Sequence, residues 1–131
     1  MSPRHLYLAI LLLLALATAA LAAEVEGIDL GAEAAALGQP LVADFGMNRC
    51  SSCIKQSEAI EVLEGETLGR VGWKFIHIGG DEKTAARYKI LLIPTLIFFD
   101  EHGVERYRYV GYMDAEAFRE KLRELRMLQG T

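Results

Sequence analysis

The chain has 131 residues, of which 52% are hydrophobic and 24% are charged, and its formal net charge is -4 at pH 7. This composition suits one compact domain and argues against a disordered or low-complexity chain. Acidic and basic residues are interspersed and leave no basic face, so we expect no nucleic-acid partner.

The amino terminus has the layout of a secretory signal peptide. Residues 6–23 are uncharged and rich in Leu and Ala, and they follow Arg4. Ala20-Leu21-Ala22 supplies the small residues of a cleavage site, so we expect residues 1–22 to be removed and residues 23–131 to form the domain. An uncleaved anchor is the alternative, because about 18 apolar residues is near the lower limit for crossing a bilayer. Both interpretations place the domain outside the cytoplasm, either periplasmic or secreted.

The remainder of the chain predicts short helices alternating with strands. Apolar, β-branched and aromatic runs indicate the strands, while Asp, Gly and Pro mark helix ends and turns. In chain order we expect a helix over 32–37 capped by Asp29, a strand over 41–46, a helix from Cys50 to Leu68, a strand over 75–78, a helix over 82–88 capped by Asp81, a strand over 94–99, a turn over 100–103, a strand over 104–110 and a final helix capped by Asp114.

The order of these elements restricts the topology. Strand, helix and strand in succession predict a right-handed parallel crossover, and the last two strands predict an antiparallel hairpin. The two longer helices each carry apolar residues at helical spacing, expected to face the core. These are Ile54, Ile60, Val62, Leu63 and Leu68 in the first helix, and Ala115, Phe118, Leu122 and Leu125 in the last.

Cys50-Ser51-Ser52-Cys53 follows the first predicted strand and contains the only two cysteines of the chain. Two intervening residues place both thiols on one helical turn, where they can form a disulfide that opens and closes. A disulfide stabilises a fold less as its loop shortens, so this spacing favours a redox role. An inert bridge and half of a metal site are the alternatives.

The two cysteines and two residues near them carry the expected chemistry. The helix amino terminus favours the thiolate of Cys50, the candidate nucleophile, and Arg49 adds a positive charge nearby. Cys53 is then the resolving thiol. Asp44 lies on an otherwise apolar strand, so desolvation should raise its pKa and suit it to act as a base near Cys53. The alternative is a buried Asp that only bonds backbone groups or caps a turn.

Four short motifs together resemble the thioredoxin superfamily over residues 41–125. They are Asp44-Phe45, the Cys50–Cys53 motif, Ile93-Pro94-Thr95 and Val110-Gly111. Within the superfamily, residues 94–100 and 111–118 are most similar to the carboxy-terminal periplasmic domain of the disulfide reductase DsbD. The resemblance implies a thioredoxin-like α/β fold, with a central mixed sheet of about four strands flanked by helices.

The resemblance also implies roles for residues outside the cysteine motif. Pro94 would follow a cis peptide bond and face the cysteines, Ile93 would offer its backbone to an extended substrate, and Gly111 would rim the same groove. A trans proline at the start of an edge strand is the alternative. With Arg49, these are the expected substrate-binding residues. His77 stands where the family has a buried lysine beside Asp44, although a strand histidine without a role in the reaction is the favoured interpretation.

These observations predict an exported thiol–disulfide oxidoreductase that reduces protein disulfides through Cys50 and Cys53. It would need no cofactor beyond its own disulfide, would act as a monomer, and would receive electrons from a separate, membrane-bound donor. A DsbA-like oxidase is one alternative, although only residues 79–93 separate the crossover from Pro94, where such proteins have a helical insertion. A metal chaperone that uses Cys50, Cys53 and His77 is another, and a redox-inactive interaction module is a third.

Overall fold

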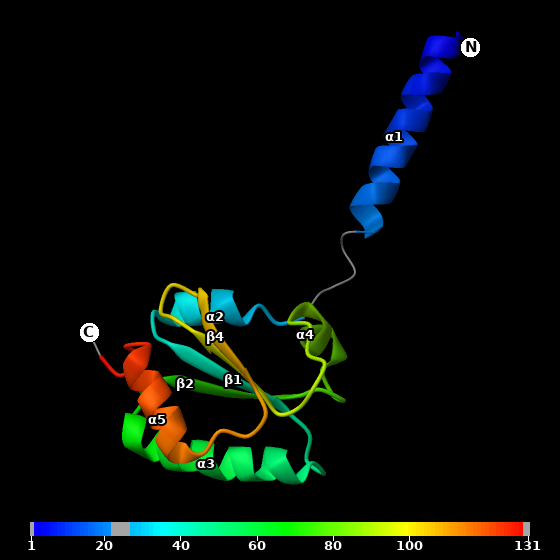
Figure 1. Ribbon diagram of the computed structural model, residues 1–131. Helices are drawn as coiled ribbons and strands as arrows, with labels where there is room; N and C mark the ends of the chain where they lie inside the picture. Colours follow the sequence, from blue (N-terminus) through cyan, green and yellow to red (C-terminus); the bar gives the residue numbers. More distant parts are fainter. Residues whose placement is uncertain (1, 22–26, 130–131) are drawn as a thin grey trace.

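The structure, a computed structural model, describes residues 2–21 and 27–129, so the expected cleavage site after Ala22 lies outside the described residues. The elements are α1 (Pro3–Leu21), α2 (Leu30–Leu37), β1 (Leu41–Gly46), α3 (Ser51–Thr67), β2 (Gly72–His77), α4 (Glu82–Arg87), β3 (Thr95–Phe99), β4 (Glu105–Val110) and α5 (Ala115–Glu124) (Figure 1). Within these described ranges, no helix combines the length and the apolar character that a membrane crossing requires.

The four strands form one mixed sheet in the order β2-β1-β3-β4. β1 runs parallel to β2 and antiparallel to β3, and β3 pairs with β4 as an antiparallel hairpin. Both predicted pairings are therefore confirmed, as is the expected α/β fold with a four-stranded mixed sheet flanked by helices. β1 occupies the middle of the sheet and all six of its residues are buried, as expected for a strand that is apolar except for Asp44.

Each face of the sheet carries its own hydrophobic cluster, since neighbouring residues of a strand point to opposite faces. On the face covered by α3 and α5, Val42 packs with Leu63 and Phe118 (Figure 1). On the other face, which α2 covers, Phe45 packs with Leu30 and Phe99. Burying each of these side chains stabilises the fold by about 1.5–3 kcal/mol. Two covered faces thus hold β1, and with it the start of α3, in a fixed position.

The helix starts confirm the capping predictions. Asp29, Asp81 and Asp114 each accept hydrogen bonds from backbone N–H groups in the first turn of the following helix. Cys50 takes the same position before α3, where its side chain accepts from the Cys53 N–H. The first catalytic candidate therefore lies at a helix amino terminus, as predicted.

Two local predictions were wrong. β2 begins at Gly72 rather than Phe75, because residues 72–74 pair with residues 41–43 of β1 despite the weak strand preference of Gly and Lys. The apolar face expected for α3 is also incorrect, since Ile54 is 47% exposed and Leu68 is 82% exposed. The buried stripe instead contains Cys53, Gln56, Ala59, Leu63 and Thr67.

Candidate active site

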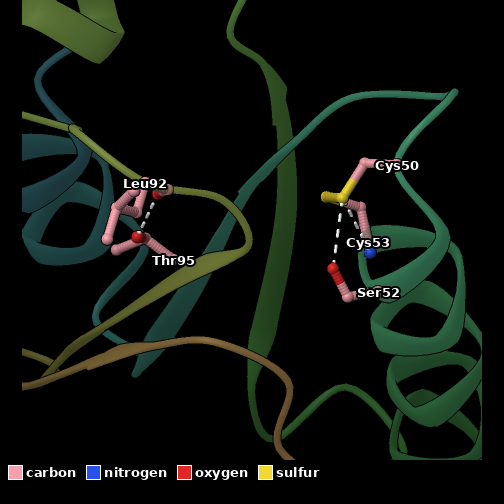
Figure 2. The surroundings of a disulfide bond; sticks show 5 residues. All are labelled: Cys50, Ser52, Cys53, Leu92 and Thr95. Atoms are coloured by element: carbon pink, nitrogen blue, oxygen red, sulfur yellow. Dashed lines mark hydrogen bonds between the residues drawn. A yellow bond between two sulfur atoms is a disulfide. The ribbon is translucent and has the colours of Figure 1, made fainter.

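Cys50 and Cys53 form a disulfide at the start of α3, with their Cα atoms 5.1 Å apart. Cys50 is half-buried, whereas Cys53 is 1% exposed. The sulfur of Cys50 accepts the Cys53 N–H at 3.3 Å and lies 3.3 Å from the Ser52 hydroxyl oxygen (Figure 2). A negative charge on Cys50 would thus meet a backbone donor and the positive end of the helix dipole. Cys50 is the sulfur that an incoming molecule can reach.

The loop before β3 faces this disulfide (Figure 2). The Ile93–Pro94 peptide bond is cis, as the resemblance implied, and Pro94 is buried. The Thr95 hydroxyl donates to the Leu92 carbonyl at 2.6 Å, which closes the loop on itself. Within residues 27–129, neither the N–H nor the carbonyl of Ile93 has a hydrogen-bond partner. An extended peptide could therefore pair with Ile93 as a further strand would.

The segment after β4 forms another side of the same site. The Gly111 N–H donates to the Pro94 carbonyl at 2.8 Å, which joins this segment to the cis-proline loop. Gly111 has a φ of +115°, a conformation that suits glycine and strains other residues. Tyr112 beside it is 42% exposed. The predicted proximity of Gly111 to Pro94 is thus present in the structure, and Arg49 is exposed in the turn before Cys50.

Asp44 is buried on β1 with neither of its carboxylate oxygens hydrogen-bonded within the described residues. Desolvation raises the pKa of Asp44 from 3.8 to about 7. This agrees with the sequence argument, and it contradicts the alternative in which Asp44 bonds backbone groups or caps a turn. Asp44 borders a cavity of about 180 Å³ between α3 and β2, which Ser57, Glu61 and Phe75 also line.

Gly46 connects the acid to the cysteines. Asp44 and Gly46 share one face of β1, because residues two apart on a strand point the same way. A Cβ atom on Gly46 would lie 3.3 Å from the Cys53 sulfur and 3.1 Å from the Phe75 ring. The absence of a side chain at Gly46 therefore lets Cys53 and Phe75 approach β1 on the face that carries Asp44.

His77 does not occupy the expected position beside Asp44. The β1–β2 register places Phe75 opposite Asp44 and His77 opposite Gly46. The alignment of residues 75–81 with the family therefore placed the partner of Asp44 two residues too far along β2. Within the described residues, no three His, Cys, Asp or Glu side chains are grouped so that they could hold a metal ion.

Sequence reasoning missed Gln56, which is fully buried and bonded to the backbone of Met113. Its position three residues after Cys53 was the available signal, since i and i+3 lie on one face of a helix. A polar residue at that position must find a partner inside the fold.

Comparisons with known proteins agree with this arrangement. The profile of the thioredoxin-like domain family matches residues 31–126. Thioredoxins from two strains of Staphylococcus epidermidis are each 30% identical to this chain over 79 residues, which is 60% of this chain and 75% of theirs.

Solved structures give the same result. Fasciola hepatica thioredoxin superposes with a TM-score of 0.60 and 26% identity, over 66% of this chain and 81% of its own. Chloroplastic thioredoxin z superposes with a TM-score of 0.68 over 77% of this chain and 91% of its own, and at 19% identity it supports the fold alone. The chain therefore belongs to the thioredoxin-like domain family, and its Cys50–Cys53 pair is that of a thiol–disulfide oxidoreductase.

Proposed function

We propose that this protein is an exported reductant of protein disulfides, with a role similar to that of the carboxy-terminal periplasmic domain of DsbD. One observation carries the proposal: the accessible sulfur of Cys50 faces a loop in which the backbone of Ile93 is free to pair with a peptide. A substrate held in that way would bring its disulfide to Cys50.

The reaction begins with both cysteines reduced. The Cys50 thiolate attacks one sulfur of the substrate disulfide, which forms a Cys50–substrate bond and releases one substrate thiolate. The Cys53 thiolate then attacks the Cys50 sulfur, which breaks that bond and releases the second substrate thiolate. The substrate gains two electrons and two protons, and the protein is left with the Cys50–Cys53 disulfide. A separate donor must return two electrons before the next cycle.

Asp44 is the proposed base for the second step. Because burial raises its pKa to about 7, both its protonated and ionised forms are populated near neutral pH. The ionised form can take the proton of Cys53, directly or through water in the adjoining cavity. Without such a base, Cys53 would be a poor nucleophile, since the thiolate is the reactive form and burial in apolar surroundings opposes it.

Export is proposed from the apolar run over residues 6–23 and the small residues that end it. A reductase outside the cytoplasm works against oxidising surroundings, so we propose a membrane-bound partner protein as its electron donor. Expression of the full chain in a bacterium with a periplasm tests export. Recovery in the periplasmic fraction, with the mass of residues 23–131, is the expected result, and a full-length cytoplasmic product contradicts it.

Trapping tests the order of bond changes. Cys53→Ser leaves Cys50 able to attack but removes the resolving thiol, so mixed disulfides through Cys50 should accumulate in cells and be released by a reductant. Cys50→Ser is the matched control and should give none. Equal trapping by both variants, or by neither, contradicts the assignment of Cys50 as nucleophile.

The reduction potential tests the direction. Equilibration of the disulfide with defined glutathione ratios should give a value near the roughly -270 mV of thioredoxin, and the reduced protein should reduce insulin. A value near the roughly -120 mV of DsbA would instead assign the protein as an oxidase.

A further inference from the structure

Gln56 joins the helix that carries the cysteines to the loop that follows β4. Its Oε1 accepts the Met113 N–H at 2.8 Å, and its Nε2 donates to the Met113 carbonyl at 3.2 Å. Gln56 is fully buried, Met113 is 5% exposed, and the two residues are 57 positions apart. This pair of hydrogen bonds fixes the position of Met113 relative to α3, one helical turn beyond Cys53.

The segment Gly111–Met113 is therefore held at both ends. Gln56 binds Met113, while the Pro94 carbonyl accepts the Gly111 N–H at 2.8 Å. Tyr112 lies between these two attachments and is 42% exposed. The attachment at Pro94 connects the segment to the cis-proline loop, and the attachment at Gln56 connects it to the cysteines. The position of Tyr112 relative to α3 and the cis-proline loop thus depends on Gln56.

The chemistry of the contact requires an amide side chain. The buried N–H and carbonyl of Met113 each need a partner, and a glutamine supplies one acceptor and one donor. A Leu or Met at this position would fill the same space but leave both backbone groups unpaired. Such a loss destabilises the folded protein unless the segment moves to find water. Movement of the segment toward solvent is therefore the expected response.

We propose that Gln56 is a positioning residue for peptide substrates, which holds Gly111–Met113 against α3 so that this segment stays beside the cis-proline loop that faces Cys50. This inference rests on the proposed function, because it concerns how a peptide binds at the site. In this role Gln56 acts through the segment Gly111–Met113 and does not contact the reacting sulfurs. Its effect should therefore fall on peptide binding and leave the chemistry at sulfur unchanged.

Two substrates distinguish these effects. Insulin is a polypeptide that can pair with the backbone of Ile93, whereas glutathione disulfide is small and would chiefly meet the sulfur of Cys50. With dithiothreitol as the final reductant, Gln56→Met should raise the KM for insulin roughly tenfold, equivalent to about 1.4 kcal/mol of binding free energy. Its kcat with insulin, its rate with glutathione disulfide and its reduction potential should stay within about twofold of wild type, well below a tenfold change.

Gln56→Glu supplies a readout that a purely structural role would not change. A protonated carboxyl group can accept from the Met113 N–H and donate to the Met113 carbonyl, as the amide does, whereas an ionised one can only accept. The KM for insulin should therefore approach the wild-type value at low pH and rise as this carboxyl group ionises. Cys50, Cys53 and Asp44 titrate in both proteins, so the ratio of the two KM values at each pH removes their contribution.

Thr67→Val is the matched control. Thr67 is also buried on α3, and its hydroxyl accepts the indole N–H of Trp73 at 3.3 Å, at the end of the helix far from the cysteines. This variant should lose stability without a change in the KM for insulin.

The outcomes separate the two proposals. An insulin KM unchanged in Gln56→Met, or insulin and glutathione disulfide rates that fall equally, overturns the role of Gln56 while the reductase remains. If Gln56→Met does not fold, Gln56→Glu provides the test. An insulin KM of Gln56→Glu, divided by that of wild type, that does not change with pH overturns the role of Gln56. A wild-type protein that reduces glutathione disulfide but never insulin overturns the proposed function, and the role of Gln56 with it.

Discussion

Asp44 is an acid in a buried environment that disfavours its charged form. A carboxyl group transferred from water to a buried site without a hydrogen bond or a cation destabilises the fold when it is charged. Lys74 on the neighbouring strand β2 does not compensate it, because Lys74 is paired with Ala43 in the sheet and its side chain bonds Glu33 on α2, on the other face. A residue that lowers the stability of the fold in this way is expected to have a role other than packing. The proposed role of Asp44 as a base for Cys53 explains why this position carries an acid.

The stability of the protein should depend on pH through Asp44. Because its pKa is raised from 3.8 to about 7, the folded protein keeps this proton between these values while the unfolded chain loses it. The contribution of Asp44 to the free energy of unfolding is therefore highest below about pH 4, falls as the pH rises, and levels off above about pH 7. We expect Asp44→Asn to be more stable than wild type at pH 8, by up to roughly 4 kcal/mol, and similar at pH 4.

Urea unfolding of the oxidised proteins at several pH values measures this difference. All other titratable groups are common to both proteins, so the difference in unfolding free energy reports Asp44 alone. A difference that is the same at pH 4 and pH 8 would contradict a raised pKa. The same variant should also slow the resolution step at neutral pH if Asp44 acts as the base.

Residue-level prediction from sequence succeeded where the local pattern was sufficient. Asp44 stood out because it interrupts an apolar strand, and Cys50 because two residues separate it from Cys53. Gln56 could not be assigned a partner, because Met113 lies 57 positions away and the contact depends on how α3 meets the loop after β4. The error at His77 has the same origin, since the residue opposite Asp44 is set by strand register rather than by local sequence.

At the scale of elements, helix ends were predicted better than buried faces. The capping residues Asp29, Asp81 and Asp114 act within three positions of their partners, so the sequence contains the whole interaction. The buried face of α3 was wrong because Ile54 and Val62 are apolar yet exposed, while Gln56 and Thr67 are polar yet buried. Helical periodicity identifies a helix, but its rotation depends on the sheet and on α5, which it packs against.

The cap of α5 allows a direct test at this scale. One carboxylate oxygen of Asp114 accepts from the N–H groups of Glu116 and Ala117 at 3.0 and 2.9 Å. Asp114→Ala removes both hydrogen bonds and should lower the free energy of unfolding by about 1 kcal/mol. Asp114→Asn keeps an acceptor oxygen and should lose little. Urea unfolding compares the three proteins, and equal losses in both variants would mean that charge rather than capping matters there.

At the scale of the whole molecule, the redox site depends on a sheet that is packed on both faces. β1 delivers Cys50 at its carboxyl end, and β3 begins at the loop that carries Pro94, so the two halves of the site come from adjacent strands. The site therefore keeps its geometry only while both hydrophobic clusters remain intact. Among the described residues, both clusters and the partly buried side chains packed against them are drawn from residues 30–128.

This dependence predicts where the chain can be shortened. A protein that begins at Ala23 retains every residue of both clusters, so its midpoint of urea unfolding should match that of the full chain. Its rate of insulin reduction should match as well. A protein that begins at Gly38 lacks α2, and with it Leu30, which is fully buried, and the Leu30 N–H bond to the Tyr88 hydroxyl at 2.8 Å.

Removal of α2 also exposes Phe45 and Phe99, which pack in the same cluster. The lost burial should lower the free energy of unfolding by at least about 3 kcal/mol, a large part of the 5–15 kcal/mol that typical domains possess. If the protein that begins at Ala23 were destabilised to the same extent, the domain boundary after Ala22 would be wrong. If neither were destabilised, α2 would not belong to the core, and β1 would need no cover on that face to hold the disulfide in position.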